Sequence, residues 1–389
     1  MNNQDLGKYI SDCLNSGLNT DSENSSLTNA FKIKVDQEKG YFDFIPAFPG
    51  PFTLTKELSD NIQTIVSGAL FPYITMLAYP SVNLVDETVN TTSLHLARGL
   101  RFYFMQGGTR RIEVPSLESN FLNQNYQIEL QENMAITPVN SPALAINGRS
   151  GSGKSVLANI IISGLLQYIN YQKWDWNYDF MNSNNAEIAN LFNGKMINIV
   201  DPKLDLTTFN FAKKHESQVN YFALNDQISN TEFLATINSK EADFLKVMHF
   251  RQLQRLKNPR LKFAPLVLSV DEVQFATSAV TRQSLNTFQS LTDRIILTAR
   301  SSSGFLMLES QSFPIPGSIS SASRDGLSYK FILGRGNNLT KQDTRFLMKD
   351  FEPSTVAMNP DEYNFGNGLF EDSTGLIRSF KTPLIREVM

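Results

Sequence analysis

One stretch constrains the fold of this chain more than any other, namely residues 147–162, NGRSGSGKSVLANIII. Gly148 is followed by four residues and then by Gly153, Lys154 and Ser155, with an apolar segment on either side. A glycine-rich turn between a buried strand and a helix directs successive backbone N–H groups at one anion, and the helix N-terminus adds a partial positive charge. A tight turn without a ligand is the alternative, but the spacing and the flanking segments favour a phosphate-binding loop.

The residue types in this loop predict a nucleoside triphosphate as the ligand. Lys154 supplies a point charge for the outer phosphates of ATP, and the hydroxyl of Ser155 completes a site for Mg²⁺. We expect the ATP phosphates to be bound by Gly148, Arg149, Ser150, Gly151, Ser152, Gly153, Lys154 and Ser155.

Hydrolysis of ATP needs an acidic element as well, and residues 265–272, PLVLSVDE, supply one. This apolar run ends in two adjacent carboxylates. Asp271 is expected to hold Mg²⁺ through water, and Glu272 to polarise the attacking water. Taken alone, such a pair could equally cap the end of a strand. Its occurrence together with a phosphate-binding loop favours the catalytic interpretation.

Apolar runs and helical segments alternate beyond the loop. Short apolar runs, of the kind expected for strands covered on both faces, occur at 195–203, 265–272, 293–300, 304–310 and 329–334. Helical segments lie between several of them, including an apolar helix at 155–169. A mostly parallel sheet covered by helices is the simplest α/β fold that fits this order.

The part of the chain before the loop is predicted to be smaller and separate. Residues 1–30 contain a short amphipathic helix and a flexible polar linker, and the helix is expected to dock on its own domain rather than on a partner. Residues 31–115 are predicted to form a small α/β domain, with strands at 31–37, 41–48, 74–79 and 100–106 and a helix at 53–70. Residues 116–389 then form the ATPase domain.

Residues 65–85 carry no charge and are long enough to suggest a membrane span. Pro72 and Pro80, several polar side chains and the lack of a flanking Lys/Arg cluster argue against that interpretation. We favour a helix end followed by a buried strand.

Composition excludes several other classes of protein. The hydrophobic content of 41% and the charged content of 19% are those of an ordinary globular protein. A single cysteine, Cys13, rules out an internal disulfide and suits a reducing compartment. His95, His215 and His249 lie far apart, so no metal-ligand constellation is expected. Because the formal net charge is −3, any contact with DNA must be local or spread around an oligomer.

Further motifs follow the loop in a recognisable order. Asp201–Pro202–Lys203 ends one apolar run, and Met248–Arg251 carries an arginine ahead of the acidic segment. Gln311 and Pro314 follow another run, with Ser310 before them. This order, over roughly residues 130 to 389, resembles the FtsK/SpoIIIE–HerA family of DNA-pumping ATPases, in which Thr is usual at the place of Ser310. The resemblance implies a RecA-like P-loop motor domain with a mostly parallel central sheet, preceded by a small α/β domain.

The layout ahead of the motor, around residues 41–63, resembles that of TcpA-type type IV coupling proteins from Gram-positive conjugative elements. Two departures are apparent, because neither transmembrane helices nor a DNA-orienting winged-helix tail is recognisable. We therefore expect a cytoplasmic protein that a partner recruits peripherally to the inner face of the cell membrane.

The resemblance also implies roles for two further residues and an assembly. Gln311 would sense the γ-phosphate, and Arg300 would reach the nucleotide of a neighbouring subunit, although Arg300 could equally be an ordinary surface arginine. Arg335 competes with Arg300 for the same role. The implied assembly is a homo-hexamer around single- or double-stranded DNA held without sequence preference. Whether the chain is a monomer without DNA stays open.

Basic side chains gather after the arginine-bearing motif, at Arg251, Arg255, Lys257, Arg260 and Lys262. They form either a solvated helix face or, repeated around a ring, a track for DNA phosphates. The insert at 171–194 has no counterpart in the family. Trp174 and Trp176 within it are expected to serve local packing rather than base stacking.

The sequence therefore predicts an ATP-hydrolysing DNA translocase. It would act as a coupling protein that delivers plasmid DNA, with its relaxase, to the channel proteins of a type IV secretion system during conjugation. Two alternatives stay open, a secretion-channel ATPase that powers assembly or protein export, and an adaptor that binds ATP and recruits the relaxase without pumping. The intact Asp271–Glu272 pair disfavours the adaptor.

Overall fold

The chain divides into two compact units. The computed structural model describes residues 2–18, 30–47, 53–87, 91–93, 96–138, 141–223, 229–278, 280–315, 317–334, 339–349, 351–358, 363 and 365–386. The smaller unit comprises Met1–Thr109, Leu339–Glu362 and Leu369–Phe380, and the larger comprises Arg110–Asn338, Tyr363–Gly368 and Lys381–Met389. The division expected from the sequence is linear, whereas two C-terminal segments here group with the smaller unit.

The smaller unit is built on an antiparallel sheet. Its strands run in the order β1 (Phe31–Asp36), β2 (Tyr41–Pro46), β5 (Arg98–Gln106) and β3 (Ile74–Leu77), and β4 (Leu84–Asp86) also pairs with β5. Helices α1 (Asn3–Gly17) and α2 (Lys56–Leu70) contribute to the same core as the strands. Leu6, Ile10 and Leu14 of α1 recur every four residues and are buried in this core, so the helix docks on its own unit as expected. The polar linker expected after α1 lies outside the described residues.

The uncharged segment 65–85 is a helix end followed by a strand, as expected. Helix α2 begins after Thr55, whose Oγ1 accepts the N–H of Leu58 at 3.2 Å, and it ends at Leu70. Strand β3 then begins at Ile74. Among the described residues, no helix combines the length and the apolar character needed to cross a membrane.

The larger unit carries most of the regular structure. Its first elements are β6 (Glu113–Val114), β7 (Ile128–Gln131), β8 (Met134–Ile136), β9 (Ala143–Gly148), α3 (Lys154–Tyr171), α4 (Ala186–Ala189), β10 (Ile197–Asp201), α5 (Leu206–Lys214) and β11 (Val219–Ala223). They are followed by α6 (Asn230–Lys257), β12 (Leu266–Val270), α7 (Val273–Thr277), α8 (Arg282–Ser302), β13 (Gly304–Ser310), α9 (Ser321–Gly326), β14 (Tyr329–Gly334) and β17 (Leu384–Ile385). The insert adds short 3-10 turns at Trp176–Tyr178, Phe180–Asn182 and Leu191–Gly194.

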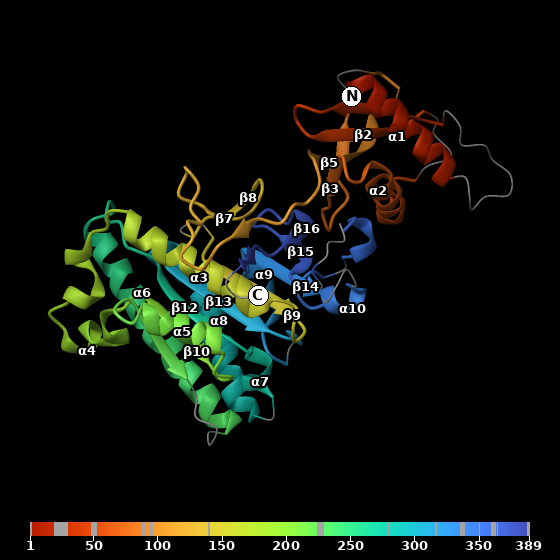
Figure 1. The fold of residues 1–389 in the computed structure, drawn as a ribbon. Helices are drawn as coiled ribbons and strands as arrows, with labels where there is room; N and C mark the ends of the chain where they lie inside the picture. Colours follow the sequence, from red (N-terminus) through yellow and green to blue (C-terminus); the bar gives the residue numbers. More distant parts are fainter. Residues whose placement is uncertain are drawn as a thin grey trace. The chain divides into compact units, whose positions relative to one another are not determined.

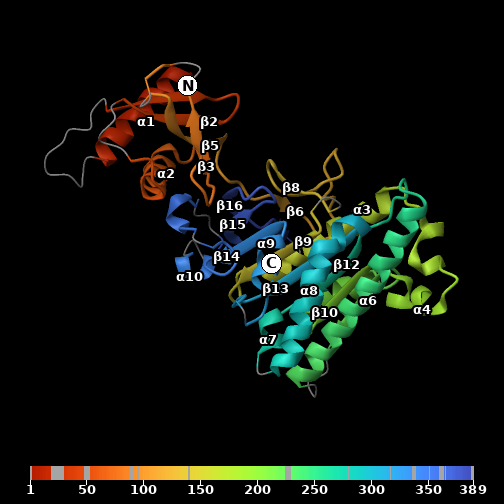
Figure 2. The same ribbon diagram turned by 180° about the vertical axis from the view of Figure 1, so that it is seen from behind.

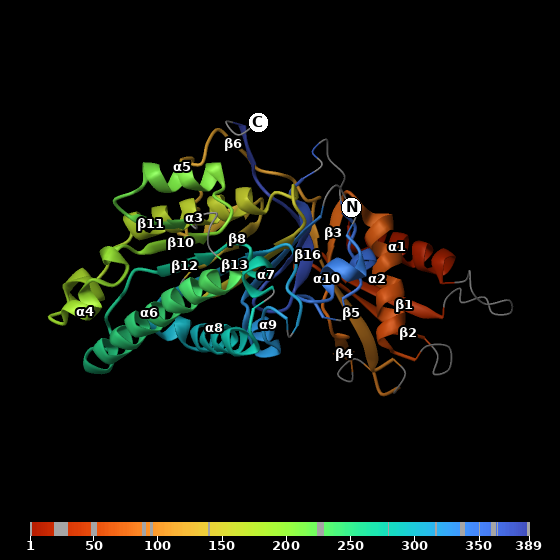
Figure 3. The same cartoon turned by 90° about the horizontal axis from the view of Figure 1, so that it is seen from below.

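Six parallel strands form the centre of this unit, in the order β11-β10-β12-β13-β9-β14. Every residue of β9, β10, β12 and β13 is buried, which fits the apolar runs that predicted them. Helices α3 and α5 cover one face of the sheet, while α6 and α8 cover the other (Figures 1, 2 and 3). The predicted α/β class with a mostly parallel, helix-covered sheet is therefore confirmed.

One predicted strand is wrong. Residues 293–300 lie inside α8, which begins after the Thr281 cap and continues to Ser302. The apolar residues of this run alternate with the helical period, because Ile295, Ile296 and Ala299 are buried whereas Leu297 is 77% exposed. A short apolar run alone cannot distinguish a strand from the buried face of a helix. Here the residues before the run, from Arg282 onward, are already helical, and the run continues that helix.

The C-terminal part of the chain contains the expected hairpin. Strands β15 (Asn367–Glu371) and β16 (Ile377–Lys381) are joined by a turn in which Gly375 has φ +81°. Before the hairpin lie the short helix α10 (Lys341–Thr344) and a 3-10 turn at Pro353–Thr355.

Candidate active site

The glycine-rich loop joins the end of β9 to the start of α3. Gly151 and Gly153 have φ values of +78° and +90°, in the left-handed region that glycine adopts without strain. At Gly148 a Cβ atom would collide with Ser152 Oγ and would lie 2.8 Å from the carbonyl oxygen of Leu333. The turn therefore leaves no room for a side chain at Gly148 and favours glycine at Gly151 and Gly153 through their positive φ, which is the physical basis of the motif seen in the sequence.

The loop leaves the N-terminus of a long helix open for an anion. Helix α3 has 18 residues, and Gly153 at its N-cap makes no side-chain capping hydrogen bond. The N–H groups of the first turn and the helix dipole together favour a bound phosphate. Lys154, the first helical residue, is buried beside them.

The acidic pair follows β12 at the same edge of the sheet, where the carboxyl ends of the strands lie. Asp271 and Glu272 are both buried, and the N–H of Glu272 donates to Asp271 Oδ1 at 2.7 Å. Glu272 itself has φ +50° and ψ +50°, an uncommon backbone conformation for a residue other than glycine. The strand end therefore holds the two carboxylates in one fixed arrangement.

A third loop brings a second lysine to the acidic pair. Lys203, which follows β10, forms an ion pair with Glu272 Oε1, and Lys154 Nζ lies 3.9 Å from the same oxygen. The sequence singled out Asp201–Pro202–Lys203 as a motif but assigned Lys203 no role. Its placement depends on β10 lying next to β12, which no local pattern specifies.

These three loops enclose one cavity of about 360 Å³. It is lined by Ser150, Gly151, Gly153, Lys154, Ser155, Val156, Lys203, Asp205, Asp271 and Glu272. The structure thus brings together five of the eight predicted loop residues and both carboxylates of the predicted pair, whereas Gly148, Arg149 and Ser152 do not line the cavity.

Burial and mutual repulsion shift the titration of the charged groups. Burial, with the charges of Glu272 and Asp201, raises the pKa of Asp271 to about 7. Burial lowers the pKa of Lys154, against the opposing effect of Glu272 and Asp271. Closely packed carboxylates with a shifted pKa are typical of functional sites.

Glu309 is an acidic residue that the sequence did not single out. It lies buried in β13, between the strands that carry the acidic pair and the phosphate loop, and Ser269 Oγ donates to its Oε1 at 3.4 Å. Burial, with the charge of Asp271 second, raises the pKa of Glu309 well above its ordinary value. The sequence shows only an isolated glutamate within an apolar run. Its position between the acidic pair and the phosphate loop becomes evident only once the order of the strands is known.

The donor set at the cavity suits Mg²⁺ in the presence of phosphates. The Ser155 hydroxyl and the Asp271 carboxylate are hard oxygen ligands of the kind that Mg²⁺ takes. Within the described part of the chain, no group of three or more His, Cys, Asp or Glu side chains could hold a metal ion. Phosphate oxygens and water would therefore complete the coordination.

The other predicted site residues lie further from the cavity lining. Gln311 is exposed directly after β13, at the same edge of the sheet, and Ser310 Oγ accepts the N–H of Gln274 at 3.0 Å. Arg300 is exposed in the last turn of α8, close to the start of β13, so it lies at the opposite edge from the phosphate loop. Arg335 lies outside the described residues.

The predicted basic cluster is not one continuous solvated face. Arg251 is fully buried and forms an ion pair with Asp179. Arg255 donates to the carbonyl oxygen of Leu261 at 3.2 Å and to Ser303 Oγ at 3.0 Å. Both roles expected for Arg251, a solvated face and a DNA track, are therefore wrong, because its side chain is closed to solvent, whereas Arg255 is half-buried and bonded to neighbouring loops. The remaining basic residues, Lys257, Arg260 and Lys262, are exposed.

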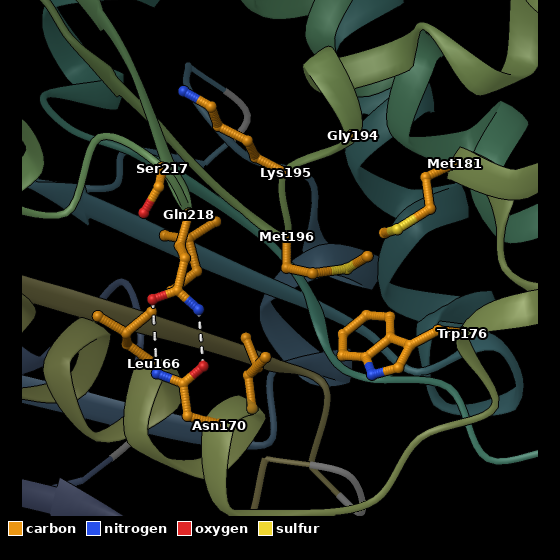
Figure 4. A pocket seen from close by; sticks show the side chains of 11 residues that line it. Leu166, Asn170, Trp176, Met181, Gly194, Lys195, Met196, Ser217 and Gln218 are labelled. Carbon is orange, nitrogen blue, oxygen red and sulfur yellow. Dashed lines mark hydrogen bonds between the residues drawn. The ribbon is translucent and has the colours of Figure 1, made fainter.

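The insert at 171–194 is part of the larger unit, and Trp174 packs locally within it against Tyr168, as expected. Trp174 Nε1 donates to the carbonyl oxygen of Ile169 at 2.8 Å. Trp176 lines a second cavity, of about 250 Å³, together with Met181 and Met196 (Figure 4). The amides of Asn170 and Gln218 pair across its wall (Figure 4).

A distant segment lies on the phosphate loop and was missed by sequence reasoning. The N–H of Gly366 donates to the carbonyl oxygen of Ser152 at 2.8 Å. Arg111 fixes this segment by donating to the carbonyl oxygen of Phe365 at 2.8 Å and to that of Thr382 at 2.7 Å. No local signal connects Arg111 with residues so far along the chain.

No protein-family model and no curated protein matches the chain. Among solved structures, it is similar to the pCW3 conjugation coupling protein TcpA in a monomer form with ATPγS, at 14% identity and TM-score 0.45, over 99% of this chain and 96% of that one. It is also similar to EssC (ATPases 2 and 3) from Geobacillus thermodenitrificans, at 12% identity and TM-score 0.38, over 78% and 44%. A third similarity is to the cytoplasmic domain of the Thermomonospora curvata type VII secretion ATPase EccC, at 18% identity and TM-score 0.40, over 62% and 25%.

The chain thus spans less than half the length of those EssC and EccC structures. Similarities of this size assign neither substrate nor partner. The fold is that of a P-loop α/β protein, with the phosphate loop, the acidic pair and Lys203 at the carboxyl edge of its parallel sheet.

Proposed function

We propose that this chain binds ATP with Mg²⁺ and hydrolyses it in the cavity between the phosphate loop and the acidic pair. One observation carries the proposal. Loop residues that suit a triphosphate line the same cavity as two buried, adjacent carboxylates. A phosphate-binding loop alone supports only the binding of a nucleotide. A carboxylate that faces the loop can also accept the proton of an attacking water, which hydrolysis requires.

The residues of the cavity divide the reaction among them. Loop N–H groups and Lys154 bind the phosphates, and Ser155 with Asp271 would hold Mg²⁺, which supplies charge neutralisation at the phosphate oxygens. Glu272 accepts a proton from water while the water oxygen bonds to the γ-phosphorus. The bond from that phosphorus to the β,γ-bridging oxygen breaks, so ADP and inorganic phosphate leave, and the proton passes to solvent.

We further propose that hydrolysis moves DNA and that the chain is the coupling protein of a conjugative plasmid. Its partners would be DNA, a relaxase and type IV secretion channel proteins at the inner face of the membrane. The order of motifs over residues 130–389 supports this, together with the position of Gln311 after the strand between the two catalytic strands. Arg300, at the opposite edge of the sheet, would act only on a neighbouring subunit of a homo-hexamer.

The test is steady-state ATP hydrolysis with and without DNA, for the natural chain, Lys154→Ala and Glu272→Gln. We expect DNA to stimulate turnover several-fold, Lys154→Ala to lose ATPγS binding, and Glu272→Gln to bind ATPγS normally while turnover falls by about 10²–10⁴-fold. Normal hydrolysis by Glu272→Gln would refute the assignment of the base. Hydrolysis that ignores DNA but responds to channel proteins would instead identify a secretion-channel ATPase, and tight binding without turnover an adaptor.

A further inference from the structure

Glu272 is a buried carboxylate that depends on a cation. Its side chain is 4% exposed, its backbone is left-handed, and it lines the same cavity as the phosphate loop. A buried carboxylate is stable in its charged form only when it is paired. The identity of its partner therefore decides where the carboxylate lies.

Two lysines share this carboxylate, and they differ in what else they must do. Lys154 Nζ is 3.9 Å from Glu272 Oε1, but Lys154 belongs to the phosphate loop and is committed to the phosphates in the proposed reaction. Lys203 forms the closer ion pair, from a different loop. When Lys154 binds the phosphates of ATP, Lys203 is the one of the two lysines that remains paired with Glu272.

The loop that carries Lys203 is fixed by hydrogen bonds to the side chain of Asp201. Asp201, which is buried, accepts the N–H of Lys203 on Oδ1 at 2.8 Å and the N–H of Asp205 on Oδ2 at 2.9 Å. The hydroxyl of Tyr221 donates to the same Oδ2 at 2.7 Å. These bonds close a turn of the kind that Asp side chains stabilise, so the backbone of Lys203 is fixed in front of Glu272.

We propose that Lys203 is a positioning residue for ATP hydrolysis, which holds the carboxylate of Glu272 in place while Lys154 serves the phosphates. The inference rests on the proposed function, because it assumes that Glu272 is the base. Asp201 and Tyr221 support Lys203 through its backbone. Lys203 itself need not contact the nucleotide.

Kinetics separate this role from a binding role. Lys203→Met is expected to lower kcat by at least about tenfold, with KM and the ATPγS affinity changed less than threefold, because placement of the base acts on the chemical step. Lys203→Arg, which keeps the cation, is expected to recover most of kcat. An unchanged kcat in Lys203→Met overturns the proposal, as does a loss of ATPγS affinity that equals the loss in rate.

A double-mutant cycle tests the ion pair itself, without activity. In the purified chain, Lys203→Met is expected to lower Tm in the natural background but not in the Glu272→Gln background. Lys246→Met is the matched control, because Lys246 is equally exposed in an unrelated ion pair and should behave alike in both backgrounds. Should Lys203→Met fail to fold, Lys203→Gln completes the same cycle.

The two measurements also keep the proposals apart. Equal Tm losses in both backgrounds overturn the Lys203 inference even if hydrolysis behaves as proposed. Conversely, a coupled pair in a chain that never hydrolyses ATP, or whose Glu272→Gln variant hydrolyses it normally, refutes the proposed function and with it the positioning role.

Discussion

Arg251 and Asp179 form a two-fold ion pair that is almost entirely closed to solvent. Nε of Arg251 donates to Oδ1 of Asp179 at 2.8 Å, and Nη2 donates to Oδ2 at 2.6 Å. Nη1 also donates to the carbonyl oxygens of Ser302 and Ser303, each at 3.2 Å, at the end of α8. One side chain of α6 thus joins the insert to the junction between α8 and β13.

Breaking this pair should destabilise the larger unit strongly. Arg251→Met leaves Asp179 buried without its cation, which costs about 3–5 kcal/mol of unfolding free energy. The double variant Arg251→Met/Asp179→Leu should lose less unfolding free energy than Arg251→Met alone, because no uncompensated charge remains. Urea unfolding followed by circular dichroism measures both. Arg386→Met is the control, since its pair with Glu113 is exposed and should contribute little. A loss in the single variant no larger than that of the control would contradict the prediction.

Glu241 should make stability fall as pH rises. This residue of α6 is fully buried, its Oε1 accepts from Thr292 Oγ1 at 2.7 Å, and its Oε2 has no hydrogen-bond partner among the described residues. Burial raises its pKa well above the ordinary 4.5, and Asp293 adds to this. The folded chain therefore keeps a proton that the unfolded chain releases above pH 4.5, so stability is lost as pH rises from there toward the folded pKa.

Glu241→Gln removes this dependence, because an amide mimics the neutral acid. The Tm of the variant relative to the natural chain should therefore increase from pH 5 to pH 8. A Tm difference that stays constant with pH would show that Glu241 is ionised in the folded chain.

The loop glycines should differ in their tolerance of alanine. At Gly148 a Cβ would meet Ser152 Oγ and the carbonyl oxygen of Leu333, so Gly148→Ala should distort the loop and abolish ATPγS binding. At Gly151 a Cβ meets nothing within 4 Å, so Gly151→Ala should suffer only the strain of φ +78°, about 1–2 kcal/mol. Calorimetric titration with ATPγS checks the order. Equal affinities for the two variants would mean that the loop adapts.

The exposed basic residues should account for DNA contact where the buried ones do not. Replacing Lys257, Arg260 and Lys262 together by Ala is expected to weaken DNA binding for every sequence tested and to reduce the slope of log affinity against log salt by up to about 3. Fluorescence anisotropy with a labelled oligonucleotide measures both quantities. Lys246→Ala is the control. An unchanged slope in the triple variant would place the DNA path elsewhere.

The sequence by itself determined the parts of this protein whose physics is local. Glycines at which the chain adopts positive φ, followed directly by a lysine, predict a phosphate loop. A carboxylate pair that ends an apolar run predicts its acidic partner. Continuous apolar runs identified β10, β12, β13 and β14, because a strand covered on both faces carries few polar side chains. The same signal failed at residues 293–300, since the buried face of a helix can present an equally short apolar run.

Only the tertiary structure decided which side chains meet. Lys203 reaches Glu272 because β10 and β12 are neighbours in the sheet. Glu309 lies between the strands that carry the acidic pair and the glycine-rich loop, because β13 separates β12 from β9. Arg251 is buried because Asp179, in an insert far from it in sequence, supplies its counter-charge. Strand order and the pairing of distant charges depend on long-range packing and desolvation. Neither strand order nor charge pairing produces a periodic pattern in the sequence, so neither could be predicted from it.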